Sequence, residues 1–453
     1  MKPSTIALAL AGLTLFAWSG CSGSDDSKPP APGDLKGSAT EFVVLLGKED
    51  FAGAVGRFDA AMSKALPEPK LQETWRSIVK QAGPFKKTLG TRTMQQAGYE
   101  VVFVTCEFEQ TILDAKVVFN QAGQIGGLWF VPGQRPTSDA GAPPVPPKTV
   151  REKEVKVGDG EWALSGTLAL PTAGDRSPCP AVVLVHGSGP LDQDETVGAN
   201  KPFRDLAWGL AAKGIPVLRY EKRTKAYPTK FLAMRSFTVK DETIDDALNA
   251  VARLRTTEGL AADHIFVLGH SLGGIVAPRI GQADPAIAGL IIMAGATRPI
   301  EDLMLEQTRY ILSLDGELSS DDKAKLAELQ KEVNQVKKAT NSSSTTFVLG
   351  APPSYWLDLR RYDAPATAGA LKQPLLILQG GRDYQVTQAD FEGWRKALAS
   401  RENVTFKLYP KLNHLFIAGD GRSTPADYDQ PGRVANEVIN DIADWISKQQ
   451  PPR

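Results

Sequence analysis

A serine near the middle of the chain has the neighbours that nucleophilic catalysis requires. The segment IFVLGHSLGG, residues 265–274, contains the pattern Gly-x-Ser-x-Gly with Ser271 at its centre. An apolar run typical of a buried strand precedes the pattern, and a helical pattern follows it. On such a tight strand-to-helix turn the serine hydroxyl is exposed, and the N–H groups of the helix amino end can stabilise a forming anion. We therefore expect Ser271 to attack a carbonyl carbon.

A serine hydroxyl needs a base, and the four histidines of the chain allow a choice by elimination. His264 lies at the far end of the strand before the nucleophile, and His270 is held within the turn. His186 belongs to a glycine-rich loop, which we expect it to brace. His414 remains; it follows a strand-like run, 404–409, and precedes the last helical pattern. We expect His414 to be the base.

The base needs a carboxylate that orients its ring. Asp383 follows the apolar run 374–379 within the segment GGRD, which places it at the carboxyl end of a buried strand. We expect Asp383 to be this acid. Three rival aspartates do not directly follow a buried strand: Asp358, Asp363 and Asp420.

The anion formed on the substrate needs two N–H donors. One is expected from the backbone of Leu272, directly after the nucleophile. The other is expected from the loop HGSGP, 186–190, whose glycines let the backbone approach closely. We assign this donor to Ser188, with Gly189 as the neighbouring alternative. The acidic residues that follow either support the loop or are solvated: Asp192, Asp194 and Glu195.

The elements that position these residues alternate between strands and helices. Apolar runs typical of strands buried on both faces lie at 181–185, 215–220, 265–268, 288–294 and 374–379. Helical patterns lie at 202–213, 239–256, 272–283 and 433–448. This alternation predicts an α/β fold with a doubly wound, mostly parallel sheet. An antiparallel pair is expected in front of it, at 151–158 and 161–170.

About eighty residues separate the strand that ends at 294 from the strand that begins at 374, far more than a connecting loop contains. We interpret them as a cap insertion at about 298–365. One predicted helix has an apolar stripe, formed by Leu326, Leu329, Val333 and Val336. Aromatic residues near Tyr355 either cover a pocket or pack within the cap.

Two segments rich in Pro, Gly, Ser and Asp divide the chain. Residues 21–37 are interpreted as a flexible tether and residues 132–147 as a linker. Between them, 38–131 shows helical patterns followed by three strand-like runs, which predicts a small α+β domain. Residues 148–453 form the larger domain described above.

Over about residues 150–450 the chain resembles the α/β-hydrolase superfamily, in which the order serine, acid, histidine is typical. The run HGSGPLDQDE, followed by KPFRDLAWGLAAKGIPVLRYEKR, resembles a group of bacterial carboxylesterases with a signal peptide and a small uncharacterised N-terminal domain. This resemblance implies the α/β-hydrolase fold and hydrolysis of a small-molecule ester through Ser271, Asp383 and His414. A serine peptidase or an acyltransferase of the same fold, which would use the same residues, is the alternative enzyme. A catalytically idle, ligand-binding envelope lipoprotein is the alternative from another class.

Composition excludes several other functions. The 52 basic and 52 acidic residues cancel, so no charge excess favours nucleic acid. The chain has neither the HExxH pattern nor paired cysteines at zinc spacing, so we expect no metal and no cofactor. Cys106 is interpreted as a buried thiol within a strand, and whether it pairs with Cys179 is left open.

Residues 1–20 have the form of an export signal, with Lys2 followed by an apolar run. Cys21 follows Ser19-Gly20, which resembles the site at which bacterial lipoproteins are cleaved and lipidated, although Trp18 replaces the usual leucine. We expect a protein anchored to the cell envelope through lipid on Cys21. Ser22 is compatible with the periplasmic face of the outer membrane.

The mature chain should therefore begin at Cys21 and carry lipid there. Mass spectrometry of the N-terminal peptide from the native host measures this. An unmodified N-terminus at another residue would contradict the expectation.

Overall fold

The computed structural model describes residues 35–96, 99–120, 122–133, 146–172, 178–341 and 343–449. The chain forms two compact units that divide near residue 144. The predicted signal, Cys21 and most of the predicted linker lie outside the described residues.

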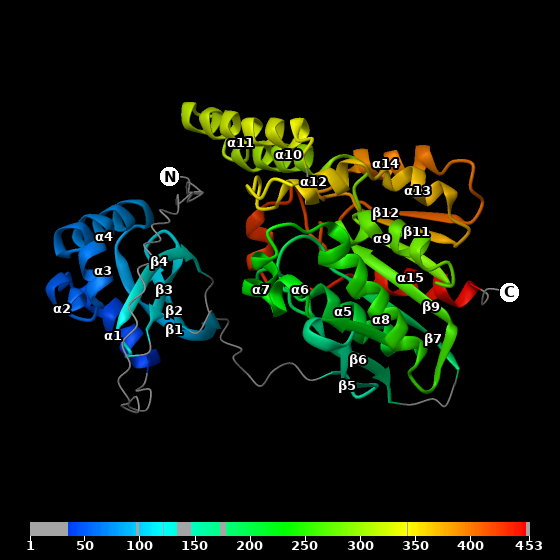
Figure 1. The fold of residues 1–453 in the computed structure, drawn as a ribbon, viewed down its shortest axis with the longest axis horizontal. Coiled ribbons are helices and arrows are strands. Elements are labelled where there is room, and N and C mark those ends of the chain that lie inside the picture. Colours follow the sequence, from blue (N-terminus) through cyan, green and yellow to red (C-terminus); the bar gives the residue numbers. More distant parts are fainter. Residues whose placement is uncertain are drawn as a thin grey trace. The chain divides into compact units, whose positions relative to one another are not determined.

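The first unit packs helices against one face of an antiparallel sheet (Figure 1). Its helices are α1 (Leu35–Gly47), α2 (Phe51–Val55), α3 (Ala60–Ala65) and α4 (Glu68–Ala82). In the described part of the unit the sheet has the order β1 (Phe85–Gln96), β2 (Tyr99–Phe108), β3 (Ile112–Phe119) and β4 (Ile125–Pro132). Phe42, Trp75 and Phe108 lie in its core, together with the buried thiol of Cys106. The predicted α+β architecture is confirmed.

Strand β4 is an addition to the three strands that the sequence predicted. Its residues pair with β3, from Phe119 opposite Ile125 to Leu113 opposite Pro132. The pair Gly126-Gly127 interrupts the alternation of apolar and polar residues by which strands are recognised. Strand β4 is therefore defined by its pairing with β3 and not by a local alternation of apolar and polar residues.

The second unit contains a mixed sheet whose order, in the described residues, is β12-β11-β10-β9-β7-β8-β6-β5. Its strands are β5 (Val150–Val157), β6 (Leu164–Pro171), β7 (Cys179–Val185), β8 (Val217–Tyr220), β9 (Leu260–His270), β10 (Gly289–Met293), β11 (Leu375–Gly380) and β12 (Val404–Tyr409). The strands from β12 to β8 run parallel, and β6 and β5 continue the sheet antiparallel. The mostly parallel sheet and the preceding antiparallel pair agree with the sequence prediction.

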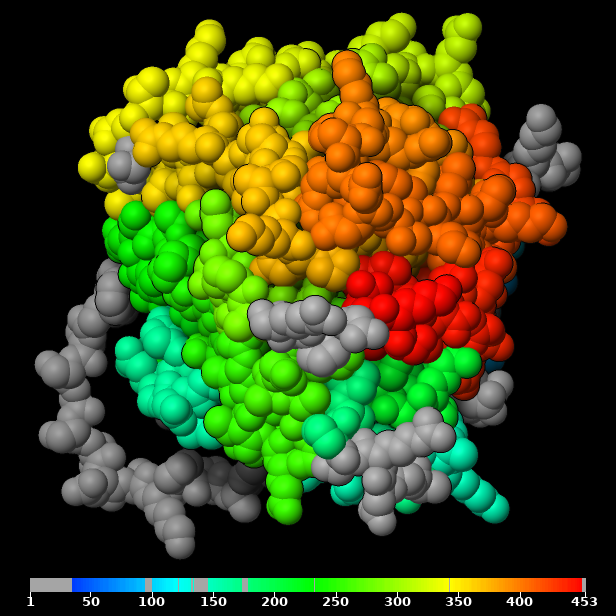
Figure 2. All heavy atoms as spheres, turned by 90° about the vertical axis from the view of Figure 1, so that its right-hand side faces the viewer, coloured from blue at the N-terminus to red at the C-terminus, as the bar shows by residue number. Residues whose placement is uncertain are grey.

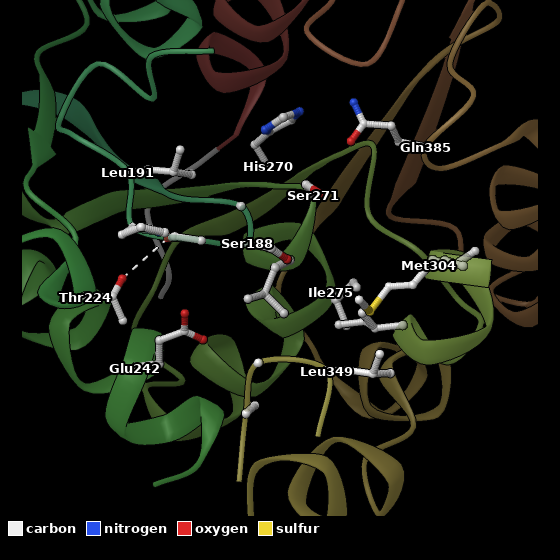
Figure 3. A pocket seen from close by; sticks show the side chains of 18 of the residues that line it. Ser188, Leu191, Thr224, Glu242, His270, Ser271, Ile275, Met304, Leu349 and Gln385 are labelled. Carbon is white, nitrogen blue, oxygen red and sulfur yellow. Dashed lines mark hydrogen bonds between the residues drawn. The ribbon is translucent and has the colours of Figure 1, made fainter. Parts of the chain in front are cut away.

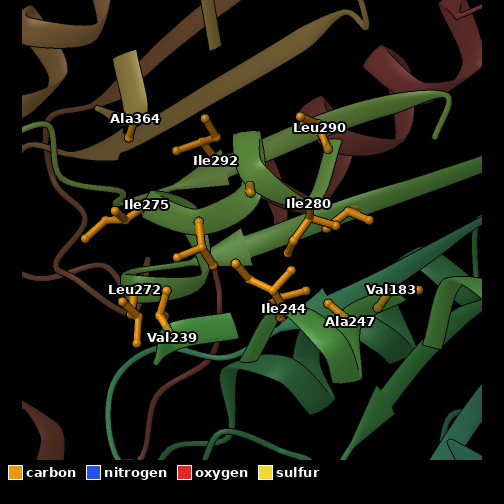
Figure 4. Close-up of a cluster of buried hydrophobic side chains, with 14 of the residues drawn as sticks. Val183, Val239, Ile244, Ala247, Leu272, Ile275, Ile280, Leu290, Ile292 and Ala364 are labelled. Carbon is orange, nitrogen blue, oxygen red and sulfur yellow. The ribbon is translucent and has the colours of Figure 1, made fainter. Parts of the chain in front are cut away.

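Helices cover both faces of this sheet (Figure 1). The helices that pack on the sheet are α5 (Pro202–Ala211), α8 (Asp245–Arg255), α9 (Leu272–Ala283), α13 (Ala364–Ala370), α14 (Gln388–Ala397) and α15 (Asn436–Lys448). Neighbouring residues of one strand enter opposite cores. Val183 packs with α8 and α9 (Figure 4), whereas Val182 and Leu184 pack with α5 and α15. Burial on both faces explains why the parallel strands are continuous apolar runs.

The segment between β10 and β11 forms the predicted insertion. It contains α10 (Ile300–Leu312), α11 (Ser320–Lys338) and α12 (Pro353–Arg360) before α13. Figure 2 shows its yellow residues gathered along one edge of this unit. Within α11, Leu326, Val333 and Val336 are buried, whereas Leu329 is only partly buried.

Two further short helices, α6 (Arg223–Ala226) and α7 (Pro228–Ala233), follow β8. Among the described residues, no helix combines the length and the apolar character needed to cross a membrane. Cys179, like Cys106, is a free thiol.

Every candidate site residue follows a parallel strand at its carboxyl end. Ser271 follows β9, Asp383 follows β11 and His414 follows β12, while the loop 186–190 follows β7. The carboxyl ends of parallel strands meet at one edge of a sheet, where ligands bind in open α/β folds. The topology therefore brings these residues to a common edge.

Candidate active site

Ser271 lies on a strained turn that only glycine neighbours permit. Its φ of 53° and ψ of −116° are rare for a residue with a side chain. A Cβ on Gly269 would overlap the carbonyl oxygen of Gly273, and a Cβ on Gly273 would overlap that of Val185. The Ser271 N–H donates to the carbonyl of Met293 on β10 over 2.9 Å. The turn thus holds the serine at the start of α9, as the pattern predicts.

Asp383 and His414 form a buried pair. The distance between His414 Nδ1 and Asp383 Oδ2 is 2.7 Å, and Gln379 Nε2 donates to the same oxygen over 3.2 Å. Asp383 Oδ1 accepts from the backbone N–H groups of Gln385 and Val386 at 2.8 and 3.0 Å. Four contacts fix this carboxylate, and it orients the imidazole so that Nε2 is left for proton transfer.

Ser271 and His414 line the same cavity, together with Ser188, Gly189 and Leu272. Figure 3 shows Ser188 and Ser271 at this cavity. Among the hydrogen bonds of the described residues, none joins Ser271 Oγ to His414 Nε2. Catalytic hydrogen bonds are often long before substrate binds, so the shared cavity is the relevant observation.

The rival aspartates have other roles. Asp358 pairs with Arg279, with both oxygens within about 3.1 Å of the guanidinium. Asp363 caps α13 by accepting from the N–H of Ala366, and Asp420 is exposed. The structure brings none of the three to His414.

The loop after β7 approaches the nucleophile closely. A Cβ on Gly187 would lie 3.1 Å from the Cβ of Ser271. The Gly187 N–H donates to Glu195 Oε1 over 2.6 Å, so it cannot serve a substrate oxygen. The next N–H along the chain belongs to Ser188, which lines the cavity. This geometry excludes Gly187 as a donor, and the donors expected at Leu272 and at Ser188, or alternatively Gly189, remain predictions.

Glu195 and His270 form a second buried pair beside the first. His270 Nδ1 lies 3.0 Å from Glu195 Oε2, and His270 Nε2 lies 2.9 Å from the carbonyl oxygen of His414. Because a carbonyl only accepts, His270 Nε2 is the donor to His414, and the nearby carboxylate of Glu195 favours a proton on Nδ1 as well. Burial alone lowers the pKa of His270, but Glu195, the carbonyl of His414 and the charge of Asp383 together outweigh it and raise that pKa above its usual value.

The remaining polar residues of the loop organise its backbone. Burial lowers the pKa of His186 to about 4, so its ring is neutral at pH 7, and its Nε2 lies 3.0 Å from the carbonyl oxygen of Asp192. Asp192 accepts from the backbone N–H groups of Asp194 and Thr196. Asp194 forms ion pairs with Lys201 and Arg219. The three acidic residues therefore support the loop.

Sequence reasoning missed the pair of Glu195 with His270 and also a buried ion pair at this edge between Lys222 and Glu242. Their Nζ and Oε1 atoms are 2.9 Å apart, and Lys222 Nζ also donates to the Gly187 carbonyl over 2.7 Å. Lys222 comes two residues after β8. The position of Lys222 just after a parallel strand is the sequence feature that could have identified it as a residue of the site.

The fold and this arrangement of residues define a serine hydrolase with the α/β-hydrolase architecture. The family model described as "Serine aminopeptidase, S33" matches residues 176–420, more than half of the chain. The chain belongs to this family. A second model, described as a protein of unknown function (DUF3887), matches residues 39–128.

Individual proteins are also similar to this chain, over different shares of their length. Esterase EstD of Thermotoga maritima is 39% identical over 411 residues, which cover 90% of this chain and 94% of that protein. Among solved structures, an esterase of Pyrococcus furiosus is 16% identical, with a TM-score of 0.41, over 66% of this chain and 91% of its own. An acylaminoacyl peptidase of Pyrococcus horikoshii is 13% identical, with a TM-score of 0.45, over 82% of this chain and 57% of its own.

Loss of the acid or the base should abolish most turnover without unfolding the chain. We expect Asp383→Asn and His414→Ala each to lower kcat by roughly 10³-fold or more, because the imidazole loses its orienting charge or is removed. Steady-state kinetics and circular dichroism measure the two effects. Asp358→Asn is the matched control and should keep kcat within about threefold of wild type. A damaging Asp358→Asn beside a mild Asp383→Asn would reverse the assignment.

The protonated His270 should give the enzyme an alkaline limit. The pKa of His270 is raised in the folded chain, so the stabilisation of the folded site by its charge is complete below pH 6.5. This stabilisation is lost as the pH rises through the raised pKa. Glu195, Asp383 and the backbone of His414 are the groups that favour its charge. We expect Glu195→Gln to move the alkaline fall of kcat/KM to lower pH.

Profiles of kcat/KM against pH for wild type and Glu195→Gln measure this shift. Asp192→Asn removes a carboxylate from the same loop and should leave the alkaline limb in place. If kcat/KM falls at the same alkaline pH in wild type and in Glu195→Gln, His270 does not govern the alkaline limit.

Proposed function

We propose that this protein is a carboxylesterase that cleaves short or medium acyl esters through an acyl-enzyme on Ser271. The single observation that carries the proposal is the 39% identity to an esterase across nearly the whole of both chains. The arrangement of Ser271, Asp383 and His414 supports the same chemistry.

The proposed reaction follows from the positions of these groups. His414 Nε2 takes the proton of the Ser271 hydroxyl as the oxygen attacks the ester carbonyl, and the N–H groups of Leu272 and Ser188 bind the resulting oxyanion. His414 returns the proton to the departing alcohol, which leaves the acyl group on Ser271. Water, deprotonated by His414, then attacks the acyl group and releases the acid.

The cavity beside Ser271 suits a small, mostly apolar substrate. Its volume is about 600 Å³, within the range of small-molecule sites. The insertion supplies part of its wall, and the side chains of Ile275, Met304 and Leu349 face it in Figure 3. Tyr355 and Trp356 also line it, which supports the first of the two interpretations of these aromatic residues.

The charges at the cavity argue against an aminopeptidase, despite the family description. An aminopeptidase binds the ammonium group of a peptide, for which an unpaired carboxylate is suited. Among the described residues that line the cavity, the carboxylates are Glu195 and Glu242. Glu195 pairs with His270 and Glu242 with Lys222, so neither carries a net charge to offer.

The outer surface of the insertion argues against a lipase. Helix α11 is largely charged and polar on its exposed side, where Asp321, Lys323 and Glu328 lie in its first three turns. A cap that opens onto an oil surface needs an exposed apolar patch. A water-facing cap favours a soluble ester.

We further propose that the protein is exported and anchored to the envelope by lipid on Cys21. The support is the sequence alone, namely the apolar run of the first twenty residues and the Ser19-Gly20-Cys21 segment. The periplasmic face of the outer membrane is the expected location.

A substrate series tests the proposed specificity. We expect kcat/KM for acetyl and butyryl p-nitrophenyl esters to exceed that for long-chain esters by roughly tenfold or more, because each unfavourable methylene costs about 1 kcal/mol. Aminoacyl-anilides should remain near the background set by Ser271→Ala. A preference for anilides would establish a peptidase, and a preference for long chains a lipase.

A further inference from the structure

Lys222 is a buried cation that the reaction described above does not use. Its side chain is only 2% exposed, and its ammonium group contacts Glu242 Oε1 at 2.9 Å and the Gly187 carbonyl oxygen at 2.7 Å. Tyr355, from α12 of the insertion, donates to the other oxygen of Glu242 over 2.9 Å. A buried ion pair contributes little net stability because desolvation offsets its attraction. Stability alone therefore gives no reason for this arrangement.

The contact with Gly187 fixes the direction of the neighbouring N–H. The Gly187 carbonyl and the Ser188 N–H belong to one planar trans peptide, so they point in opposite directions. Lys222 Nζ lies 2.7 Å from the Gly187 carbonyl oxygen, so the N–H of Ser188 points away from the ammonium group. Ser188 and Ser271 line the same cavity, and Gly187 closely approaches Ser271, so this region is within reach of a Ser188 N–H that points away from Lys222.

Gly187 is held from its other side as well. Its N–H donates to Glu195 over 2.6 Å, and Glu195 is itself paired with His270. The two peptide planes that flank Gly187 are thus each bonded to a buried charged group. Rotation of the 187–188 peptide would break the contact with Lys222 and leave the ammonium group without one of its acceptors.

We propose that Lys222 is a positioning residue that orients and polarises the Gly187–Ser188 peptide, making the Ser188 N–H the second oxyanion donor. A cation on the carbonyl oxygen draws electrons from the peptide nitrogen, which makes its N–H a stronger donor. The effect is greatest when negative charge develops on the substrate oxygen, so it stabilises the transition state more than the bound ester. The inference rests on the proposed ester hydrolysis at Ser271.

The test compares variants of the buried pair. Lys222→Met alone would strand the carboxylate of Glu242, so Lys222→Met/Glu242→Gln is the principal variant, and Lys222→Arg keeps a cationic donor. Lys407→Met is the control, because this lysine pairs with Asp441 and has no contact with Gly187. The substrate is p-nitrophenyl butyrate, and the probe is a butyryl trifluoromethyl ketone, which forms a tetrahedral oxyanion on serine. Its Ki is measured by competition with fluorophosphonate labelling, which requires no ester turnover.

We expect the double variant to lower kcat by roughly 10- to 100-fold with little change in KM, and to raise Ki for the ketone in parallel with the fall in kcat/KM. Lys222→Arg should recover most of the loss, and Lys407→Met should resemble wild type. In Ser188→Pro, which lacks the N–H, adding the double variant should raise Ki no further. These results together would support the positioning role.

A folded double variant with wild-type kcat and Ki would overturn the inference while leaving the esterase proposal intact. A fall in kcat with an unchanged Ki would also overturn it, because the effect would lie outside the oxyanion site. If the double variant does not fold, Lys222→Met alone takes its place, and an unchanged Ki in that folded variant, beside a raised Ki in Ser188→Pro, would likewise refute it. Failure of the wild type to hydrolyse any ester would reject the proposed function, and the ketone measurements would still decide the role of Lys222.

Discussion

The site depends on a close backbone approach between the start of α9 and the end of β7. Gly273 lies so near the carbonyl oxygens of Val185 and His186 that no side chain fits between them. This contact holds the turn that carries Ser271 against the loop that begins at His186, and the strained φ of Ser271 is maintained by the surrounding structure. The nucleophile and the expected oxyanion donors are thus fixed by backbone packing before any substrate binds, which is the preorganisation that electrostatic catalysis requires.

Buried charges then set the orientation of the groups that this packing brings together. Asp383 orients the ring of His414, whereas the His270 ring bonds to the backbone of His414 and lies 3.0 Å from the carboxylate of Glu195. Glu195 and Lys222 bond to the two sides of Gly187. Each isolated charge would be costly at this depth, and pairing removes most of that cost. The same pairing leaves the cavity without a free carboxylate among its described residues, which is why it suits a neutral ester better than a peptide amine.

The sequence predicted the parts of this site that have local signatures. The glycines around Ser271 and the strand ends before Asp383 and His414 are short patterns, and the alternation of apolar runs and helices predicted the sheet that joins them. Partners far apart in the chain have no such signature: Lys222 and Gly187 are bonded across 35 residues, and His270 and His414 across 144. Strand β4 was missed for a related reason, since Gly126-Gly127 hides its alternation and only pairing with β3 defines it. Local pattern therefore predicted the reacting groups, while the groups that hold them became visible only in the fold.

The central claim, that Ser271 is the nucleophile of a preorganised site, is tested most directly by mapping a covalent adduct. The purified chain is treated with a fluorophosphonate, digested, and analysed by mass spectrometry, with Ser271→Ala alongside. The account predicts one phosphonylated peptide, modified on Ser271, and no labelling of the folded variant. An adduct on another residue, or equal labelling of Ser271→Ala, would contradict it.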